Sequence, residues 1–111
     1  MLNFGLEASK RGTSALVTLR GDFDVQVVEE VTAKLAEVES TGPELLVLDL
    51  SGLSFLDSSG MGVIAAAHSR AVAAGRRFLV VDPPWSVMRA FKLSGLDEVI
   101  TIVQDLASVY P

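Results

Sequence analysis

The stretch from Leu45 to Leu50 places the strongest constraint on how this chain can fold. It is almost wholly apolar and carries a single acidic residue, Asp49. A short run of this kind is typical of a strand that is buried on both faces of a sheet. Segments with helical spacing lie on either side of it and could form the covering layers. We therefore expect α/β layers with at least some parallel strand pairing.

Hydrophobic spacing divides the rest of the chain into short alternating segments. We expect strands over residues 2–8, 15–19, 45–50, 78–81 and 99–103, and helices over residues 25–39, 58–74 and 85–93. Asp24 stands where the first helix needs an N-cap. Gly21 is expected to end the second strand, residues 51–57 to form a loop, and residues 104–110 to add one or two helical turns. The length of 111 residues suits one domain, spanning residues 1–111.

Composition and charge disfavour several classes of function. The formal net charge is −5, and the only adjacent basic pairs are Lys10-Arg11 and Arg76-Arg77. Because no basic cluster is visible in the sequence, nucleic acid and an anionic membrane surface are disfavoured as partners. No apolar stretch is long enough to cross a bilayer, and residues 1–10 do not resemble a secretory signal. The absence of cysteine fits a reducing, cytoplasmic compartment.

The junction Asp57-Ser58-Ser59-Gly60 lies where a loop is expected to enter a helix. Aspartate and serine side chains can cap the free amide groups of such a helix start, and the helix dipole favours negative charge there. A phosphate on either serine would gain from this field but would stand beside the Asp57 carboxylate. Gly60 and Gly62 weaken the first turn, which indicates either close approach of another backbone or ligand, or tight packing or curvature. On spacing alone, Asp57 and Ser58 could simply be caps.

Neither serine has a visible catalytic base. The only histidine, His68, lies nine residues after Ser59, which is about half a revolution and roughly 13 Å further along the same helix. A serine nucleophile needs a base within hydrogen-bonding reach, so we expect no enzyme activity. The glycines also lack the lysine and the spacing of a phosphate-binding loop. We expect neither a cofactor nor a metal.

Trp85 follows Pro83 and Pro84 and precedes the expected short helix. An exposed aromatic side chain at this point would suit anchoring of a partner. A buried one would instead cover the edge of the core. The sequence leaves both interpretations open.

Four segments resemble the STAS-domain family of bacterial anti-sigma factor antagonists. The run SFLDSSGMGVI at residues 54–64 closely resembles the family's signature. Residues 19–24 are similar to the segment before its first helix, residues 45–53 to its central strand and exit, and residues 94–96 to its late Ser-Gly-Leu turn. The resemblance covers nearly the whole chain. It implies a single-domain STAS-like α/β fold, with a mixed, mostly parallel sheet of four to five strands and helices packed on it.

The resemblance also implies a mechanism. Members of the family bind a cytoplasmic anti-sigma factor, often a serine kinase, and thereby free the sigma factor. The kinase, which binds the ATP, phosphorylates a serine of the motif, and a metal-dependent serine phosphatase reverses the reaction. By position the acceptor would be Ser59, with Ser58 as the second choice, and Asp57 and Ser58 would cap and shape the loop. The partner-binding residues implied in this way are Asp24, Asp57, Ser58, Ser59, Gly60 and Met61.

Two other functions fit the same residues. Related STAS modules occur in stress-signalling complexes and transporter assemblies, where the chain would be a scaffold without phosphorylation and the serines only caps. A helix start that attracts anions could also sense a small ligand or a nucleotide. We expect a monomer or a weak dimer, with no binding to nucleic acid or membrane.

Overall fold

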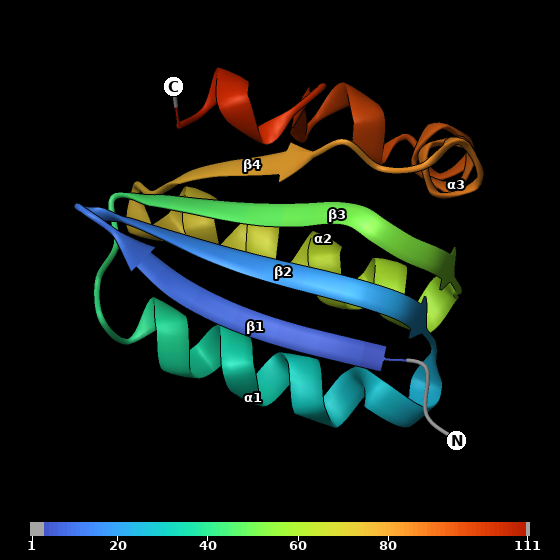
Figure 1. Ribbon diagram of the computed structural model, residues 1–111, viewed down its shortest axis with the longest axis horizontal. Helices are drawn as coiled ribbons and strands as arrows, with labels where there is room; N and C mark the ends of the chain where they lie inside the picture. The colour runs from blue at the N-terminus through green and yellow to red at the C-terminus, as the bar shows by residue number, and fades with distance from the viewer. Residues whose placement is uncertain (1–3, 111) are drawn as a thin grey trace.

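The predicted central strand lies in the middle of the sheet. The computed structural model describes residues 4–110, and the sheet in that range has five strands in the order β1-β2-β3-β4-β5 (Figure 1). β3 (Leu45–Leu56) pairs in parallel with β2 (Ser14–Phe23) and with β4 (Arg77–Val81). β5 (Thr101–Val103) extends the parallel set, whereas β1 (Phe4–Arg11) forms an antiparallel hairpin with β2. The mixed, mostly parallel sheet implied by the resemblance is confirmed.

Within the described residues, three α-helices follow the parallel strands. They are α1 (Val28–Glu39), which follows the 3-10 turn η1 (Val25–Val27), α2 (Ser58–Ala74) and α3 (Trp85–Ser94). Two further 3-10 turns, η2 (Leu96–Glu98) and η3 (Leu106–Ser108), flank β5. Gly75 ends α2 with a φ of 68°, a left-handed conformation that favours glycine. Across residues 4–110, no helix has the length and apolarity needed to cross a membrane.

Successive side chains of β3 point to opposite faces of the sheet, and both faces are covered. Leu46, Leu48 and Leu50 are fully buried in the main core, to which all three α-helices contribute. Val47 lies on the other face, in a smaller cluster packed against the C-terminal segment around η3. The burial of the central strand on both faces, which its composition predicts, is therefore confirmed.

The carboxyl ends of β2 and β3 differ from the prediction. Gly21 does not end β2, and residues 51–56 are not a loop, because the two strands continue to Phe23 and Leu56 and pair with each other. The ladder shifts register twice along this extension. Each shift disturbs the alternation of inward and outward side chains. The sequence in this region therefore lacks the regular alternation of apolar and polar residues that marks a strand.

Differences near the ends of the chain are smaller. The first strand covers residues 4–11 rather than 2–8, and residues 2 and 3 lie outside the described residues. The last strand begins at Thr101 rather than at residue 99, because the amides of Val99 and Ile100 donate to the carbonyl of Leu96 and close the η2 turn. The helical segment expected after residue 104 is the single 3-10 turn η3.

Replacing Leu48 by alanine should lower the free energy of unfolding by about 2–5 kcal/mol, because the Leu48 side chain is fully buried in the core. Val72→Ala is the control, since Val72 is 66% exposed on α2 and its loss should change stability by less than about 0.5 kcal/mol. Urea unfolding followed by circular dichroism measures both values. Equal losses for the two variants would contradict this placement of β3.

Candidate functional site

The carboxyl ends of β2 and β3 bring two of the predicted site residues to one edge of the sheet. Phe23 ends β2 and pairs with Leu56, which ends β3. Asp24 and Asp57 are the next residues along the chain. The backbone N–H of Asp57 donates to the carbonyl oxygen of Phe23 at 3.2 Å, which joins the two strand ends. This edge is the usual place for functional groups in α/β folds.

Asp57 caps α2. Its backbone is extended, with φ of −95° and ψ of −177°, and its carboxylate accepts a hydrogen bond from the N–H of Gly60 at 3.0 Å. Its carbonyl oxygen accepts from the N–H of Met61, also at 3.0 Å. The expectation that Ser58 shares the capping is wrong, because Ser58 is already the first residue of the helix and its side chain is exposed. The cap therefore depends on neither serine hydroxyl.

Asp24 is an N-cap as predicted, but it caps the 3-10 turn η1, because the helix expected from residue 25 becomes α-helical only at Val28. Its carboxylate accepts from the N–H of Gln26 at 2.9 Å, and its carbonyl oxygen accepts from the N–H of Val27 at 3.1 Å. Val25, beside it, is 67% exposed. Two capping carboxylates on neighbouring strand ends therefore place negative charge next to the start of two helical segments.

Gly60 is required by packing in the first turn of α2. A Cβ atom at this buried position would lie 2.6 Å from Cδ1 of Leu56 and 3.0 Å from the ring of Phe23. The methyl group of Leu56 could move, but the Phe23 ring is fully buried in the core. A Cβ atom on Gly62 would meet nothing within 4 Å. Of the interpretations that the sequence left open, tight packing applies to Gly60.

The two serines occupy the first and second positions of α2 and differ in exposure. Ser58 is exposed, Ser59 is half-buried, and Met61 is half-buried with part of its side chain against the main core. All six residues implied as partner-binding lie around the joined ends of β2 and β3: Asp24, Asp57, Ser58, Ser59, Gly60 and Met61.

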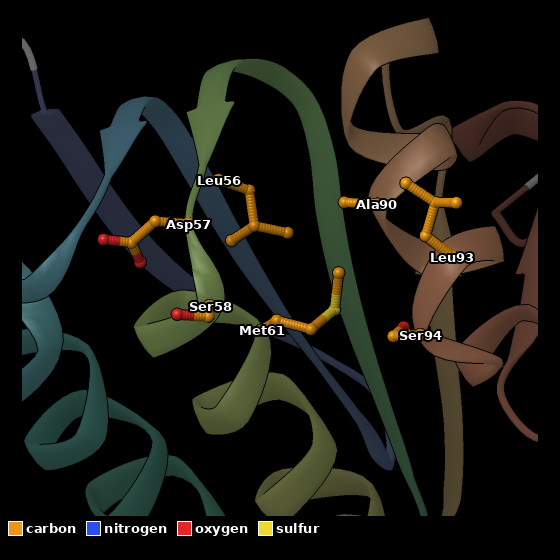
Figure 2. A pocket seen from close by; sticks show the side chains of 7 residues that line it. All are labelled: Leu56, Asp57, Ser58, Met61, Ala90, Leu93 and Ser94. Atoms are coloured by element: carbon orange, nitrogen blue, oxygen red, sulfur yellow. The ribbon is translucent and has the colours of Figure 1, made fainter.

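A groove between the start of α2 and α3 adjoins these residues and was not predicted. Its volume is about 350 Å³, and it is lined by Leu56, Asp57, Ser58, Met61, Ala90, Leu93 and Ser94. Figure 2 shows Leu56 and Met61 extending toward α3, whereas the Asp57 carboxylate points the other way. Leu93 is 80% exposed although Val87 and Phe91 of the same helix are buried. An apolar residue outside the buried stripe of α3 is the sequence signal that could have revealed this groove.

His68 contacts a core side chain, whereas Trp85 is exposed. The His68 ring packs edge-on against Phe78 of β4, with ring centroids 5.9 Å apart. Trp85 is 76% exposed, so the interpretation that it covers the core is wrong. The Arg89 guanidinium lies 5.7 Å from the centre of the Trp85 ring.

Comparison with known proteins shows the family. The STAS domain profile matches residues 6–109. The chain belongs to the STAS domain family. The "Anti-sigma F factor antagonist" of Lysinibacillus sphaericus is 31% identical to this STAS domain over 96 residues, which are 86% of this chain and 81% of that protein.

Solved structures agree with this assignment. The anti-sigma factor antagonist SpoIIAA in its unphosphorylated form matches this STAS domain with a TM-score of 0.77 and 26% identity, over 96% of this chain and 92% of that chain. The Bacillus cell fate determinant SpoIIAA in the phosphorylated form matches with a TM-score of 0.72 and 25% identity, over 96% of each chain. The STAS-like fold implied by the sequence is therefore confirmed.

Gly60→Ala should lower the free energy of unfolding of this STAS domain by about 1–3 kcal/mol, because the added methyl group would overlap Leu56 and the Phe23 ring. Gly62→Ala is the matched control in the same helical turn. With open space around it, this change should raise stability by up to about 1 kcal/mol. Urea unfolding measures both, and a neutral or stabilising Gly60→Ala would contradict the tight packing.

Asp57→Ala removes the carboxylate that caps α2 and should cost about 0.5–2 kcal/mol of stability. Asp57→Asn keeps an oxygen acceptor at the same place and should retain most of that stability. Ser58→Ala should have little effect, because Ser58 is not the cap. Thermal unfolding compares the three variants, and a loss for Ser58→Ala as large as that for Asp57→Ala would show that the serine shares the capping.

Proposed function

We propose that this STAS domain is an anti-sigma factor antagonist, a non-enzymatic cytoplasmic protein that binds an anti-sigma factor of the serine kinase type and so releases the sigma factor. The relative from Lysinibacillus sphaericus and the solved SpoIIAA structure support this, because one is named an anti-sigma F factor antagonist and the other an anti-sigma factor antagonist. The observation that carries the proposal is the serine pair at the start of α2. It directly follows the Asp57 cap, at the sheet edge that also carries the Asp24 cap, and Ser58 lines an apolar groove.

Phosphorylation of Ser59 is the proposed switch. The family resemblance assigns the acceptor to the second serine of the motif, and a solved relative exists in a phosphorylated form. Ser59 is half-buried, whereas the neighbouring Ser58 is exposed and is therefore the alternative acceptor. The two positions can be separated by substitution, because the Asp57 cap is independent of both hydroxyl groups.

A phosphate at Ser59 would act mainly on the partner. It would add about 1.5 to 2 negative charges at neutral pH. The start of α2 would favour this charge by about 0.3–1 kcal/mol. The Asp57 carboxylate would oppose it, since two unit charges 4 Å apart in water interact by about 1 kcal/mol. Because the two effects oppose each other and each is small, the fold should persist, and the added charge and bulk would disturb the contact with the kinase.

Incubation with the cognate anti-sigma kinase and ATP should attach a phosphate to Ser59, which peptide mass spectrometry can locate. Ser59→Ala should abolish the incorporation while keeping kinase binding, and Ser58→Ala, the matched control, should still be phosphorylated. Ser59→Asp should weaken kinase binding by about tenfold, the effect of roughly 1.4 kcal/mol of repulsion. A metal-dependent serine phosphatase should remove the phosphate and restore binding.

Other outcomes would redirect the proposal. Phosphate on Ser58 alone would move the acceptor to the first serine. A kinase that is active and binds the domain without phosphorylating it would favour the scaffold function instead. Co-purification with a transporter or a stress-signalling complex, and with no kinase, would contradict the proposed partner.

A further inference from the structure

The two adjacent basic pairs of the sequence meet at the edge of the sheet opposite the serines. Lys10 and Arg11 end β1, whereas Arg76 and Arg77 lie at the start of β4. Strand register places Arg11 and Arg77 in one row across β1, β2, β3 and β4. Figure 1 shows this edge at the left, where the β1–β2 hairpin meets the beginnings of β3 and β4. The fold thus assembles a basic cluster that the linear sequence does not show.

No acidic side chain of the described residues forms an ion pair with these four cations. The ion pairs found in residues 4–110 join Arg20 to Glu7, Lys34 to Glu37 and Arg70 to Glu39. The carbonyl oxygen of Glu39 accepts a hydrogen bond from Arg76, but the Glu39 carboxylate is occupied by two hydrogen bonds from Arg70, of 2.7 and 2.9 Å. The positive charge of the cluster is therefore available to a ligand.

Two of the guanidinium groups are held in place by neutral partners. Arg76 donates from Nε to the carbonyl oxygen of Pro43 at 2.9 Å and from Nη2 to that of Glu39 at 3.4 Å. The Arg11 guanidinium lies 4.7 Å from the centre of the Tyr110 ring, and the Tyr110 hydroxyl is 2.7 Å from the hydroxyl of the buried Ser14. Cations fixed in this way lose little freedom when an anion binds.

The cluster surrounds a surface pocket. Arg11, Arg76 and Arg77 line a pocket of about 670 Å³, and Lys10 lines an adjoining one of about 260 Å³ that shares the wall formed by residues 42–44. Among the described lining residues, Glu44 is the single acidic side chain of both pockets. The larger volume lies within the range of about 300–1,000 Å³ that is usual for small-ligand sites.

We infer that this basic edge is a second binding site, and that its ligand is a phosphate-bearing anion with more than one negative charge. One guanidinium group can donate two parallel hydrogen bonds to two oxygens of a phosphate. Several fixed cations also favour a multiply charged anion over a monocarboxylate. The site is independent of the serine switch, because Asp24, Asp57 and both serines lie at the other end of β2 and β3. A ligand at the basic edge leaves the serines accessible to a kinase.

Inorganic pyrophosphate is the probe for this site. Titrated into the full chain at low salt, it should shift the backbone NMR signals of residues 10–14, 42–45 and 75–77 and saturate, with a dissociation constant below about 1 mM. Arg77→Gln should weaken binding by about fivefold, the effect of one charge at about 4 Å in water. Glu44→Gln removes the opposing acid and should strengthen binding by a similar factor. Circular dichroism checks that both variants are folded.

Lys92→Gln is the matched control, because Lys92 is an exposed cation on α3 that does not line either basic pocket. It should change the affinity less than about twofold. Equal weakening by Arg77→Gln and Lys92→Gln would mean that pyrophosphate responds only to net charge and would overturn the inference. Shifts that do not saturate, or that are spread over all basic residues, would overturn it as well.

Sedimentation with lipid vesicles distinguishes a lipid headgroup from a soluble phosphorylated compound as the ligand. Phosphatidylcholine vesicles with and without phosphatidic acid are sedimented with the protein, and pyrophosphate is added as competitor. Binding to the acidic vesicles alone, reversed by pyrophosphate and weakened by Arg77→Gln, would assign the site to a lipid headgroup. Binding of pyrophosphate without sedimentation would assign it to a soluble phosphorylated compound. Binding to neither would overturn the inference.

Discussion

The parallel ladder between β2 and β3 is the constraint on which the candidate site depends. It continues through two register shifts to the pair Phe23 and Leu56, so both strands end at the same level. Asp24 directly follows β2 and caps η1, and Asp57 directly follows β3 and caps α2. A shorter ladder would leave these carboxylates on separate loops. The hydrogen bond from the Asp57 amide to the Phe23 carbonyl oxygen closes the junction.

Packing and capping then fix the start of α2 together. Gly60 has no side chain at the point where Leu56 and Phe23 fill the space, so the first helical turn can approach the strand end. The same residue donates its amide to the Asp57 carboxylate. Helix propensity alone disfavours glycine here by up to about 1 kcal/mol. The close packing of Gly60 against the end of β3 offsets this cost and fixes the positions of the exposed Ser58 and the half-buried Ser59.

The two edges of the sheet carry opposite charge. Asp24 and Asp57 lie at the carboxyl ends of β2 and β3, whereas Arg11, Arg76 and Arg77 gather near the amino ends. Exposed charges this far apart are largely screened from each other at physiological ionic strength, where the Debye length is about 8 Å. Each edge can therefore meet its own partner. The net charge of −5 conceals this separation, because it sums over both edges.

Sequence patterns alone determined the α/β class, the buried central strand, the bounds of helix α2, and Asp24 and Asp57 as candidate caps, because these depend on local spacing and on short side-chain to backbone contacts. The extension of β2 and β3 could not be predicted, since bulges remove the period-two pattern that marks a strand. The exclusion of Ser58 from the cap, the groove beside Leu93 and the basic edge were decided only by the tertiary structure. The groove and the basic edge depend on which distant segments meet: α2 with α3 at the groove, and the end of β1 with the start of β4 at the basic edge.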